Sequence, residues 1–336
     1  MTKVAVMGGG SWGTAFANVV ADAGAADVEV CGRRAELAEA ISTRHENPDY
    51  LPGIALNPAL AATADPAKAL AGAEFAVVAV PSQSLRANLR AWAPHIAPGA
   101  VVVSLIKGVE LGTSLRASEV IAQELDLPPE RVAAVTGPNL AREIAERQPA
   151  TAVVACPHEP TAVRFQHLCK SSYFRPYSGT DLVGAELGGA VKNVIALAVG
   201  VAVGMGFGDN AKAALITRGL AETVRLAVAL GADEHTLAGL AGMGDLVATC
   251  SSPLSRNRTF GEQLGKGFTV EQAVENTKQT AEGVKSSESI LALARANGID
   301  MPITEAVVGM IHHDLSPAEA LQAFMARTAK PERYGV

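Results

Sequence analysis

A lysine in the middle of the chain stands where an amine could transfer a proton. Lys192 follows Gly188 and Gly189 and leads into the almost uncharged run Val194–Gly208. Half-burial in an apolar wall lowers the pKa of a lysine and suits its amine to take up or donate a proton. The two glycines would clear space for a ligand. The structural alternative is a lysine that reaches solvent from a domain-linking helix.

A second lysine, Lys107, directly follows the apolar run Val101–Ile106. If that run is a strand of a parallel sheet, its carboxyl end faces the ligand crevice. A charged side chain there points toward the place where cofactor and substrate meet. An ordinary exposed lysine is the alternative.

Two polar clusters further along could complete such a site. Asp245 lies between Gly244 and an apolar run, where it could orient a lysine, bind a hydroxyl group or simply cap a helix. The cluster Ser255-Arg256-Asn257-Arg258 offers guanidinium forks and polar arms, the groups that a small phosphate or carboxylate needs. An exposed basic loop is the other interpretation.

A glycine-rich turn near the N-terminus has the layout of a dinucleotide site. Val4–Met7 runs into Gly8-Gly9-Gly10-Ser11-Trp12-Gly13, and a helix-forming run follows. Gly8 would allow the tight turn, Gly10 the approach of a pyrophosphate, and Gly13 close packing of helix on strand. The helix N-terminus would then offer unpaired N–H groups to the phosphates.

Two arginines narrow the choice of dinucleotide. The position where NAD sites place an acidic residue for the ribose hydroxyls is held here by Gly32-Arg33-Arg34. Guanidinium groups suit a 2′-phosphate, so we expect NADP(H), or use of both NADP(H) and NAD(H). A solvated helix start is the alternative for Arg33 and Arg34.

These residues need a scaffold, and the chain predicts one with two parts. Residues 1–180 alternate apolar strand-like runs with helical patterns, which indicates an α/β domain with a doubly wound, Rossmann-like, mostly parallel sheet. Residues 181–336 carry only helical patterns and would form an all-helical substrate and catalytic domain. The expected strands are Val4–Met7, Val28–Cys31, Phe75–Val80, Val101–Ile106, Val132–Thr136 and Thr151–Ala155; the expected helices of the first part are Thr14–Ala23, Arg34–Ser42 and Ser114–Leu125.

Composition limits the classes of function. The 336 residues are 49% apolar and carry a net charge of −6, which gives no reason to expect a nucleic-acid partner. Four scattered cysteines and no His/Cys cluster predict reduced, buried thiols and no metal site. The most apolar run, about fifteen residues, is too short to span a bilayer. The first strand begins too close to Met1 for a signal peptide, so a cytoplasmic protein is expected.

Taken together, the motifs resemble the NAD(P)-dependent glycerol-3-phosphate dehydrogenases of the bacterial, biosynthetic type. The match covers nearly the whole chain in order and spacing. The matching motifs are Gly8-Gly9-Gly10-Ser11-Trp12-Gly13-Thr14-Ala15, Lys107-Gly108, Gly137-Pro138, Glu186-Leu187-Gly188-Gly189-Ala190-Val191-Lys192-Asn193, Gly242-Met243-Gly244-Asp245-Leu246, Ser255-Arg256-Asn257-Arg258 and Glu282-Gly283.

The resemblance implies a reaction and a set of site residues. Dihydroxyacetone phosphate would be reduced reversibly to sn-glycerol 3-phosphate for glycerophospholipid synthesis, with Lys192 as the catalytic acid/base and Asp245 orienting it. The implied substrate contacts are Lys107, Gly137, Asn139, Lys192, Asp245, Ser255, Arg256 and Asn257. The implied cofactor contacts, besides Gly8, Gly10 and Gly13, are Ser11, Trp12, Arg33, Arg34, Lys107, Ala141, Arg256 and Glu282.

Two positions depart from the family pattern. Asn139 replaces the usual Ser or Thr after Gly-Pro, and Cys31 stands where the family often has Trp. One alternative hypothesis is a related ketoacid reductase or β-hydroxyacid dehydrogenase with the same two-domain architecture. The cluster Ser255-Arg256-Asn257-Arg258 argues against it. A non-catalytic NADP(H) sensor is another, against which the two lysines argue. A homodimer is the expected assembly, although no residue pattern specifies it.

Overall fold

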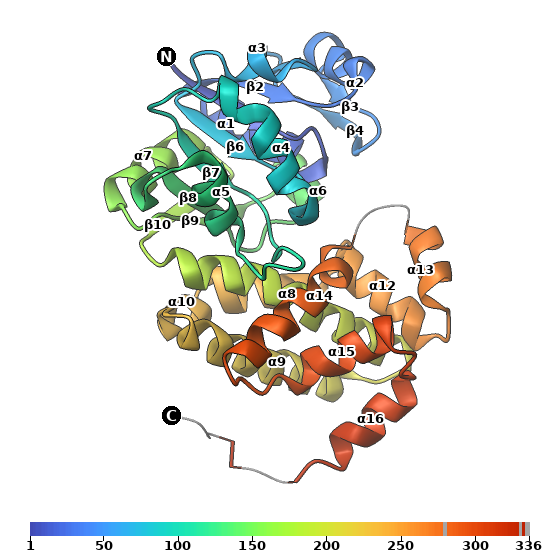
Figure 1. The fold of residues 1–336 in the computed structure, drawn as a ribbon. Helices are drawn as coiled ribbons and strands as arrows, with labels where there is room; N and C mark the ends of the chain where they lie inside the picture. The colour runs from blue at the N-terminus through green and yellow to red at the C-terminus, as the bar shows by residue number, and fades with distance from the viewer. Residues whose placement is uncertain (278–280, 329–330, 333–336) are drawn as a thin grey trace.

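The computed structural model describes residues 1–277, 281–328 and 331–332. Figure 1 shows a sheet domain packed on a helical domain, with α8 lying directly beneath the sheet domain. The strands are β1 (Thr2–Met7), β2 (Ala26–Cys31), β3 (Glu46–Asn47), β4 (Leu51–Ala55), β5 (Ala61–Thr63), β6 (Phe75–Val78), β7 (Val101–Ser104), β8 (Val132–Thr136), β9 (Ala150–Ala155) and β10 (Phe174–Gly179). The helices of the sheet domain are α1 (Ser11–Ala23), α2 (Ala35–Glu39), α3 (Pro66–Leu70), α4 (Leu85–Trp92), α5 (Ala117–Leu125), α6 (Ala141–Ala145) and α7 (Glu159–Cys169).

The predicted doubly wound sheet is confirmed. Eight strands lie in the order β10-β9-β8-β7-β6-β1-β2-β5, and those from β8 to β5 run parallel. Their apolar runs are buried because helices cover both faces of the sheet. From β1 the chain adds β2 on one side of the sheet and β6 on the other. Open α/β sheets bind ligands at the crevice between two such strands, here β1 and β6.

The far edge of the sheet differs from the prediction. The run that we expected to continue the parallel sheet, observed as β9, is antiparallel to β8. The sequence analysis missed β10, which pairs with β9 in parallel. Its Pro176 argues against a strand interior, but an edge strand tolerates proline because one of its sides has no ladder to complete.

Several predicted elements are shorter than expected, because the chain turns toward the crevice before the apolar pattern ends. β6 stops at Val78 and β7 at Ser104. The helix expected from Ser114 begins only at Ala117, since Ser114 adopts a left-handed φ of 56° that no α-helix contains. The helix expected over Arg34–Ser42 is the short α2 followed by a π-helical turn, Ala40–Arg44.

The second half of the described chain is helical, as predicted. Its central helix α8 is apolar on all sides, and its residues Leu182–Gly204 are long and apolar enough to cross a membrane. Its most apolar stretch is 89% buried inside the protein, as a core helix would be. The helices are α8 (Leu182–Gly204), α9 (Asp209–Ala229), α10 (Glu234–Ala238), α11 (Asp245–Ser251), α12 (Arg256–Gly265), α13 (Val270–Thr277), α14 (Glu282–Ala296), α15 (Pro302–His312) and α16 (Pro317–Met325).

Glycines let α12 lie unusually close to α8. A Cβ on Gly200 of α8 would overlap the carbonyl oxygen of Arg258, and a Cβ on Gly261 of α12 would overlap that of Leu197. Backbone therefore meets backbone, and the first turn of α12 is brought alongside the middle of α8. The glycines that interrupt the apolar run serve this contact between helices.

Candidate active site

One buried carboxylate joins the two lysines. Lys192 on α8 donates a hydrogen bond to Asp245 Oδ1 at 2.5 Å, and Lys107, three residues past β7, donates to Asp245 Oδ2 at 2.6 Å. Lys192 also donates to Thr249 Oγ1 at 2.6 Å, and Lys107 donates to the carbonyl of Gly137 at 2.9 Å. Residues from both domains thus form one charged cluster at their junction.

The cluster is withdrawn from solvent. Asp245 is 1% exposed and Lys192 7%, so the alternative of a lysine that reaches solvent from α8 is wrong. Burial lowers the pKa of Lys107 to about 8; Asp245 opposes this shift and the nearby Lys192 ammonium adds to it. Two ammonium groups that share a single carboxylate carry one excess positive charge, which suits them to stabilise an alkoxide and to donate a proton.

The glycines before Lys192 have a different use from the one expected. A Cβ on Gly188 would lie 2.5 Å from the carbonyl oxygen of Ala241, and one on Gly189 would lie 2.9 Å from Thr136 Oγ1 and 3.4 Å from Lys107 Cγ. They therefore make room for the protein itself rather than for a ligand. The gap at Gly189 lets the Lys107 side chain pass close to α8 and reach Asp245.

The cluster at the start of α12 lies beside this centre. Ser255 caps the helix by accepting from the N–H of Arg258 at 3.3 Å, and Asn257 is locked by two hydrogen bonds. Its Nδ2 donates to Asn193 Oδ1 at 2.9 Å, and its Oδ1 accepts from the N–H of Gly283 at 2.9 Å. One Nδ2–H of Asn257 and the O–H of Ser255 are left to donate to a ligand.

Sequence reasoning missed three residues that hold the site together. Asn193 donates to the carbonyl of Lys107 at 3.1 Å, Thr249 contacts Lys192, and Ser82 donates to Glu282 Oε2 at 2.7 Å. Asn193 directly follows Lys192, and Thr249 lies one helical turn after Asp245, so helical spacing from those two residues could have found both. No such signal marks Ser82.

Several buried polar atoms lack a hydrogen bond within the described part of the chain. They include both amide atoms of Asn139, the Oγ1 of Thr136 and the indole nitrogen of Trp12, all buried. Buried polar atoms are normally satisfied, so unsatisfied ones mark places that a ligand can complete. Arg256 is exposed at the start of α12; partial desolvation lowers the pKa of its guanidinium, while the charge of Glu282 raises it.

The turn between β1 and α1 fits a dinucleotide. Gly8, at a φ of 137°, packs against Ala79, and a Cβ on Gly13 would overlap the carbonyl oxygen of Gly8, so both residues serve strand–helix packing. A Cβ on Gly10 would meet nothing within 4 Å, and no side chain caps the N-terminus of α1. Open space in front of uncapped N–H groups is what a pyrophosphate requires.

The two arginines lie just past β2, beside that turn. Arg33 and Arg34 are both exposed, and Arg34 donates to Asp49 Oδ2 at 2.5 Å. Its guanidinium also lies 5.9 Å from the ring centroid of Tyr50. A 2′-phosphate on the ribose would therefore have to share Arg34 with a carboxylate.

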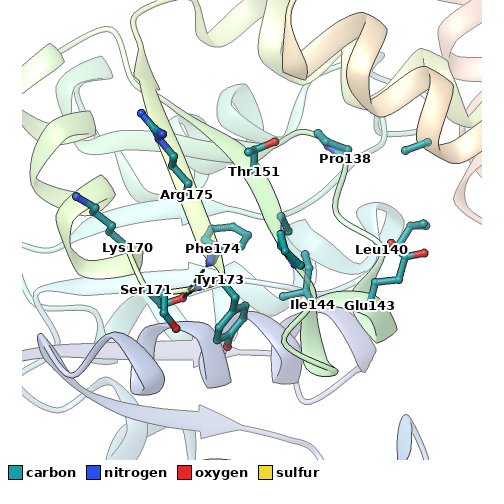
Figure 2. Close-up of a pocket in the computed structure, with 14 residues that line it drawn as sticks. Pro138, Leu140, Glu143, Ile144, Thr151, Lys170, Ser171, Tyr173, Phe174 and Arg175 are labelled. Carbon is teal, nitrogen blue, oxygen red and sulfur yellow. Dashed lines mark hydrogen bonds between the residues drawn. The ribbon is translucent and has the colours of Figure 1, made fainter.

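A groove of about 710 Å³ borders the cluster from the outside. Figure 2 shows its lining residues, which come from α6, β9, β10 and the loop 170–173 and include Lys170 and Arg175. Pro138 and Ala248 connect it to the neighbours of Gly137 and Thr249, but neither lysine of the cluster lines it. Across residues 1–277, 281–328 and 331–332, no group of His, Cys, Asp and Glu has an arrangement that could hold a metal ion. All four cysteines are free and buried.

Comparison with known proteins identifies the family. Residues 3–162 match the family model for the N-terminus of NAD-dependent glycerol-3-phosphate dehydrogenase, and residues 181–322 match the model for its C-terminus. The chain belongs to the NAD-dependent glycerol-3-phosphate dehydrogenase family. The first range includes Lys107, and the second includes Lys192 and Asp245. The resemblance inferred from the motifs is confirmed.

Relatives in this dehydrogenase family are similar over their full length. A protein of Thermobifida fusca named glycerol-3-phosphate dehydrogenase (NAD(P)+) is 76% identical over all 336 residues of both chains. One of Streptomyces griseus with the same name is 64% identical over 98% of each chain. The crystal structure of glycerol-3-phosphate dehydrogenase from Coxiella burnetii superposes with a TM-score of 0.91 at 36% identity, over 97% of this chain and 99% of that one.

A reductase of the rival class shares only the fold with this dehydrogenase. The ketopantoate reductase of Ralstonia eutropha superposes with a TM-score of 0.58 at 16% identity, over 95% of this chain and all of that one. The two-domain plan is therefore common to several reductases. The fold alone therefore does not decide the substrate.

Proposed function

We propose that the chain reduces dihydroxyacetone phosphate to sn-glycerol 3-phosphate, reversibly, with NADPH or NADH as reductant. The observation that carries the proposal is the pairing of Lys107 and Lys192 through Asp245 at the junction of the two domains. The printed names of the relatives agree with it, since they are glycerol-3-phosphate dehydrogenases that use NAD(P)+.

Lys192 is the proposed proton donor and acceptor. When bound, the nicotinamide supplies the hydride, and the protein has to manage the negative charge that develops on the carbonyl oxygen. The Lys192 ammonium gives its proton to that oxygen, and in the reverse direction the neutral amine takes it back. Lys107 stabilises the alkoxide charge, a contribution typically worth about 3 kcal/mol. Asp245 holds both amines in place through its two oxygens.

The substrate phosphate and hydroxyl groups are assigned to residues around that centre. Arg256 supplies a guanidinium, and the buried Ser255 and Asn257 supply the donors that their own contacts leave over. On the opposite side, Asn139 has an unsatisfied amide, while Gly137 lends its carbonyl to Lys107. Asn139 replaces the family's Ser or Thr, and its amide can still form hydrogen bonds at this position.

The cofactor is assigned to the turn at β1 and the residues around it. Gly10, Ser11 and Trp12 would face the pyrophosphate at the start of α1, and Arg33 with Arg34 would receive a 2′-phosphate. The remaining assigned residues come from the same turn and from both domains. They are Gly8, Gly13, Lys107, Ala141, Arg256 and Glu282.

The wider context follows from the same assignment. We place the division between the dinucleotide-binding domain and the helical catalytic domain at residues 180 and 181, in the short link between β10 and α8. The protein would act in the cytoplasm as a homodimer on a small-molecule substrate. Its product would feed glycerophospholipid synthesis.

A direct assay tests the proposal. Purified protein is incubated with dihydroxyacetone phosphate and either NADPH or NADH, and the loss of reduced cofactor is followed by absorbance. Turnover with this substrate, and none with 2-oxo acids such as ketopantoate, supports the assignment. Turnover of a 2-oxo acid instead would favour the reductases that share the fold, and cofactor binding without any turnover would favour a sensor.

A further inference from the structure

The segment that carries Lys107 continues into a small hairpin, here called hairpin 109–116. Val109 and Arg116 form an antiparallel bridge, and the N–H of Glu110 donates to the carbonyl of Leu115 at 2.9 Å. Lys107 therefore sits two residues before one end of the hairpin, and Arg116 is its other end. Any movement of the hairpin moves Lys107 with it.

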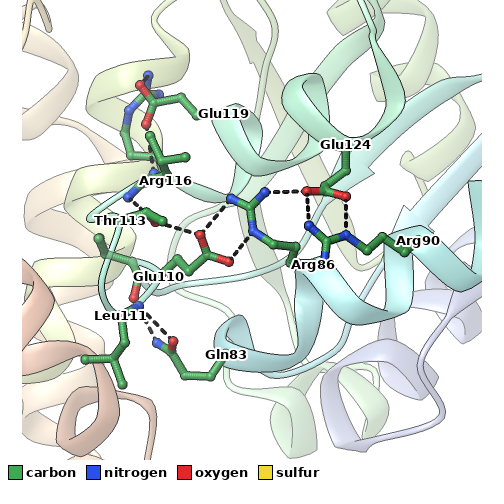
Figure 3. A network of polar contacts seen from close by, with 11 residues as sticks. Gln83, Arg86, Arg90, Glu110, Leu111, Thr113, Arg116, Glu119 and Glu124 are labelled. Carbon is green, nitrogen blue, oxygen red and sulfur yellow. Dashed lines mark hydrogen bonds and ion pairs between the residues drawn. The ribbon is translucent and has the colours of Figure 1, made fainter.

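The sheet domain holds this hairpin firmly, as Figure 3 shows. Gln83 donates to the carbonyl of Val109 at 2.9 Å and accepts from the N–H of Leu111 at 2.8 Å. Glu110 forms a bidentate pair with Arg86, at 2.9 and 2.8 Å. The hairpin thus behaves as a rigid extension of the sheet domain.

The helical domain reaches the same hairpin at its other end. Glu186 of α8 accepts from Arg116 Nη1 at 2.7 Å, from the N–H of Ser118 at 2.8 Å and from Ser118 Oγ at 2.5 Å. The Glu186 side chain is 5% exposed and that of Arg116 15%. A buried carboxylate with three donors, one of them in the first turn of α5, has little freedom to move.

The segment 107–118 is therefore joined to α8 at two points. One is at Lys192 and its neighbour Asn193, which donates to the carbonyl of Lys107 at 3.1 Å, and the other is at Glu186. Lys192 follows Glu186 by six residues, a rise of about 9 Å along α8. With only the contacts at Lys192 and Asn193, which are neighbouring residues, α8 could pivot about one point. The second attachment at Glu186 removes this freedom and sets where Lys192 stands relative to Lys107.

We propose that Glu186 and Arg116 are positioning residues for the proton transfer, which lock the Lys107-bearing hairpin to the helix that carries Lys192. The inference rests on the proposed function, because it needs both lysines to act on one substrate. Neither residue touches the proposed substrate or cofactor positions. Their effect reaches the reaction only through the spacing of the two amines.

The test compares Glu186→Gln with Glu119→Gln. Glu119 also pairs with Arg116, at 3.0 Å, but its side chain is 42% exposed, so its loss removes an equal charge and leaves the link between domains intact. In Glu186→Gln, kcat for dihydroxyacetone phosphate is expected to fall about tenfold or more, since small displacements of reacting groups cost large factors in rate. The dissociation constant and stoichiometry of NADPH binding should not change.

A pH profile separates positioning from loss of folded protein. Burial is the main reason for the low pKa of Lys107, so a loosened hairpin that admits water should move the alkaline limb of kcat to higher pH. The double variant Arg116→Gln/Glu186→Gln keeps a neutral hydrogen-bonded link and should recover part of the lost rate. If Glu186→Gln does not fold, Ser118→Ala replaces it in the test, because this variant removes one of the hydrogen bonds to Glu186. Its kcat should fall less, and the alkaline limb of its pH profile should also move to higher pH.

The outcomes are distinct. If the wild-type protein does not reduce dihydroxyacetone phosphate, the proposed function fails. If it does, and Glu186→Gln keeps its kcat, or loses rate only in proportion to its NADPH-binding fraction with an unmoved pH profile, then the positioning role is wrong. An equal loss in Glu119→Gln would overturn it as well.

Discussion

Lys107 and Lys192 reach the same carboxylate from opposite domains, each donating to a different oxygen of Asp245. Two ammonium groups at such close range would repel one another, and the shared anion offsets that repulsion. The arrangement keeps two proton-bearing amines beside one substrate position. The Lys192 ammonium also lowers the pKa of Lys107, while Asp245 raises it.

Removing the amine of Lys192 should abolish most of the turnover. In Lys192→Ala, kcat for dihydroxyacetone phosphate reduction is expected to fall by about 10²–10⁴, the usual contribution of a positioned general acid. The dissociation constant of NADPH, measured by fluorescence titration, should stay the same because Lys192 lies away from the turn at Gly10. Near-normal turnover in this variant would remove Lys192 from the mechanism.

The rate of reduction should fall on the alkaline side of the pH profile, because Lys107 stabilises the alkoxide only while it is an ammonium. Burial brings the pKa of Lys107 to about 8, so the limb is expected near pH 8. In Asp245→Asn the anion that raises the pKa of Lys107 is lost, and the limb should move to lower pH by about 1–3 units. The measurement is kcat against pH for both proteins. A limb that stays in place would show that Asp245 does not set the charge of the pair.

Cofactor preference should depend on Arg33. In Arg33→Asp the ratio of kcat/KM for NADPH to that for NADH is expected to fall about tenfold or more, since a charge-assisted contact to a phosphate is worth about 1.5–3 kcal/mol. The control is Arg44→Asp, which makes the same charge change at an exposed arginine paired with Glu46. If Arg33→Asp keeps the wild-type ratio, as the control should, then Arg33 does not select the 2′-phosphate.

The close contact between α8 and α12 should be intolerant of a single methyl group. Gly261→Ala places a Cβ onto the carbonyl oxygen of Leu197, so the helices must separate, at a cost of about 1–3 kcal/mol or more. Because Arg256 begins α12, KM for dihydroxyacetone phosphate should rise as well. In the control Gly208→Ala, the new Cβ meets nothing within 4 Å. Urea unfolding measures the loss of stability, and steady-state kinetics measure KM. An unchanged KM would show that the contact between α8 and α12 does not position the substrate-binding residues.

A buried carboxylate outside the site should make stability depend on pH. Glu222 of α9 is 1% exposed and accepts from the N–H groups of Ile303 and Thr304 at the start of α15, at 2.7 and 3.2 Å. Burial raises its pKa to about 7 from 4.5, so the folded state binds this proton more tightly than the unfolded state does. Its contribution to stability is complete below about pH 4.5 and is lost as pH rises through about 7.

The measurement is the free energy of unfolding of the wild type and of Glu222→Gln at several pH values. The wild type should lose ~3 kcal/mol relative to the variant between pH 4.5 and pH 7. Parallel pH dependences for the two proteins would show that Glu222 stays ionised in the fold. The three hydrogen bonds to its carboxylate would then outweigh burial.

Local patterns in the sequence were enough for the elements and for the chemistry of single residues. Apolar runs with turn residues at their ends predicted β1, β2, β6, β7, β8 and β9, and glycine spacing predicted the turn before α1. These features depend on neighbours within a few residues, so the chain determines them locally. The same local logic picked out Lys107, Lys192 and Asp245 as groups able to do chemistry.

Only the tertiary structure decided what these groups do to one another. Lys107 and Asp245 are 138 positions apart, and Lys192 and Asp245 are 53 apart, so no local pattern could predict that one carboxylate binds both amines. Three further features also join residues that are distant in the sequence. They are the reversed direction of β9, the packing role of Gly188 and Gly189, and the link from Glu186 to Arg116. Each depends on which distant surfaces pack together, and that is settled by the burial of whole elements rather than by the order of residues within one.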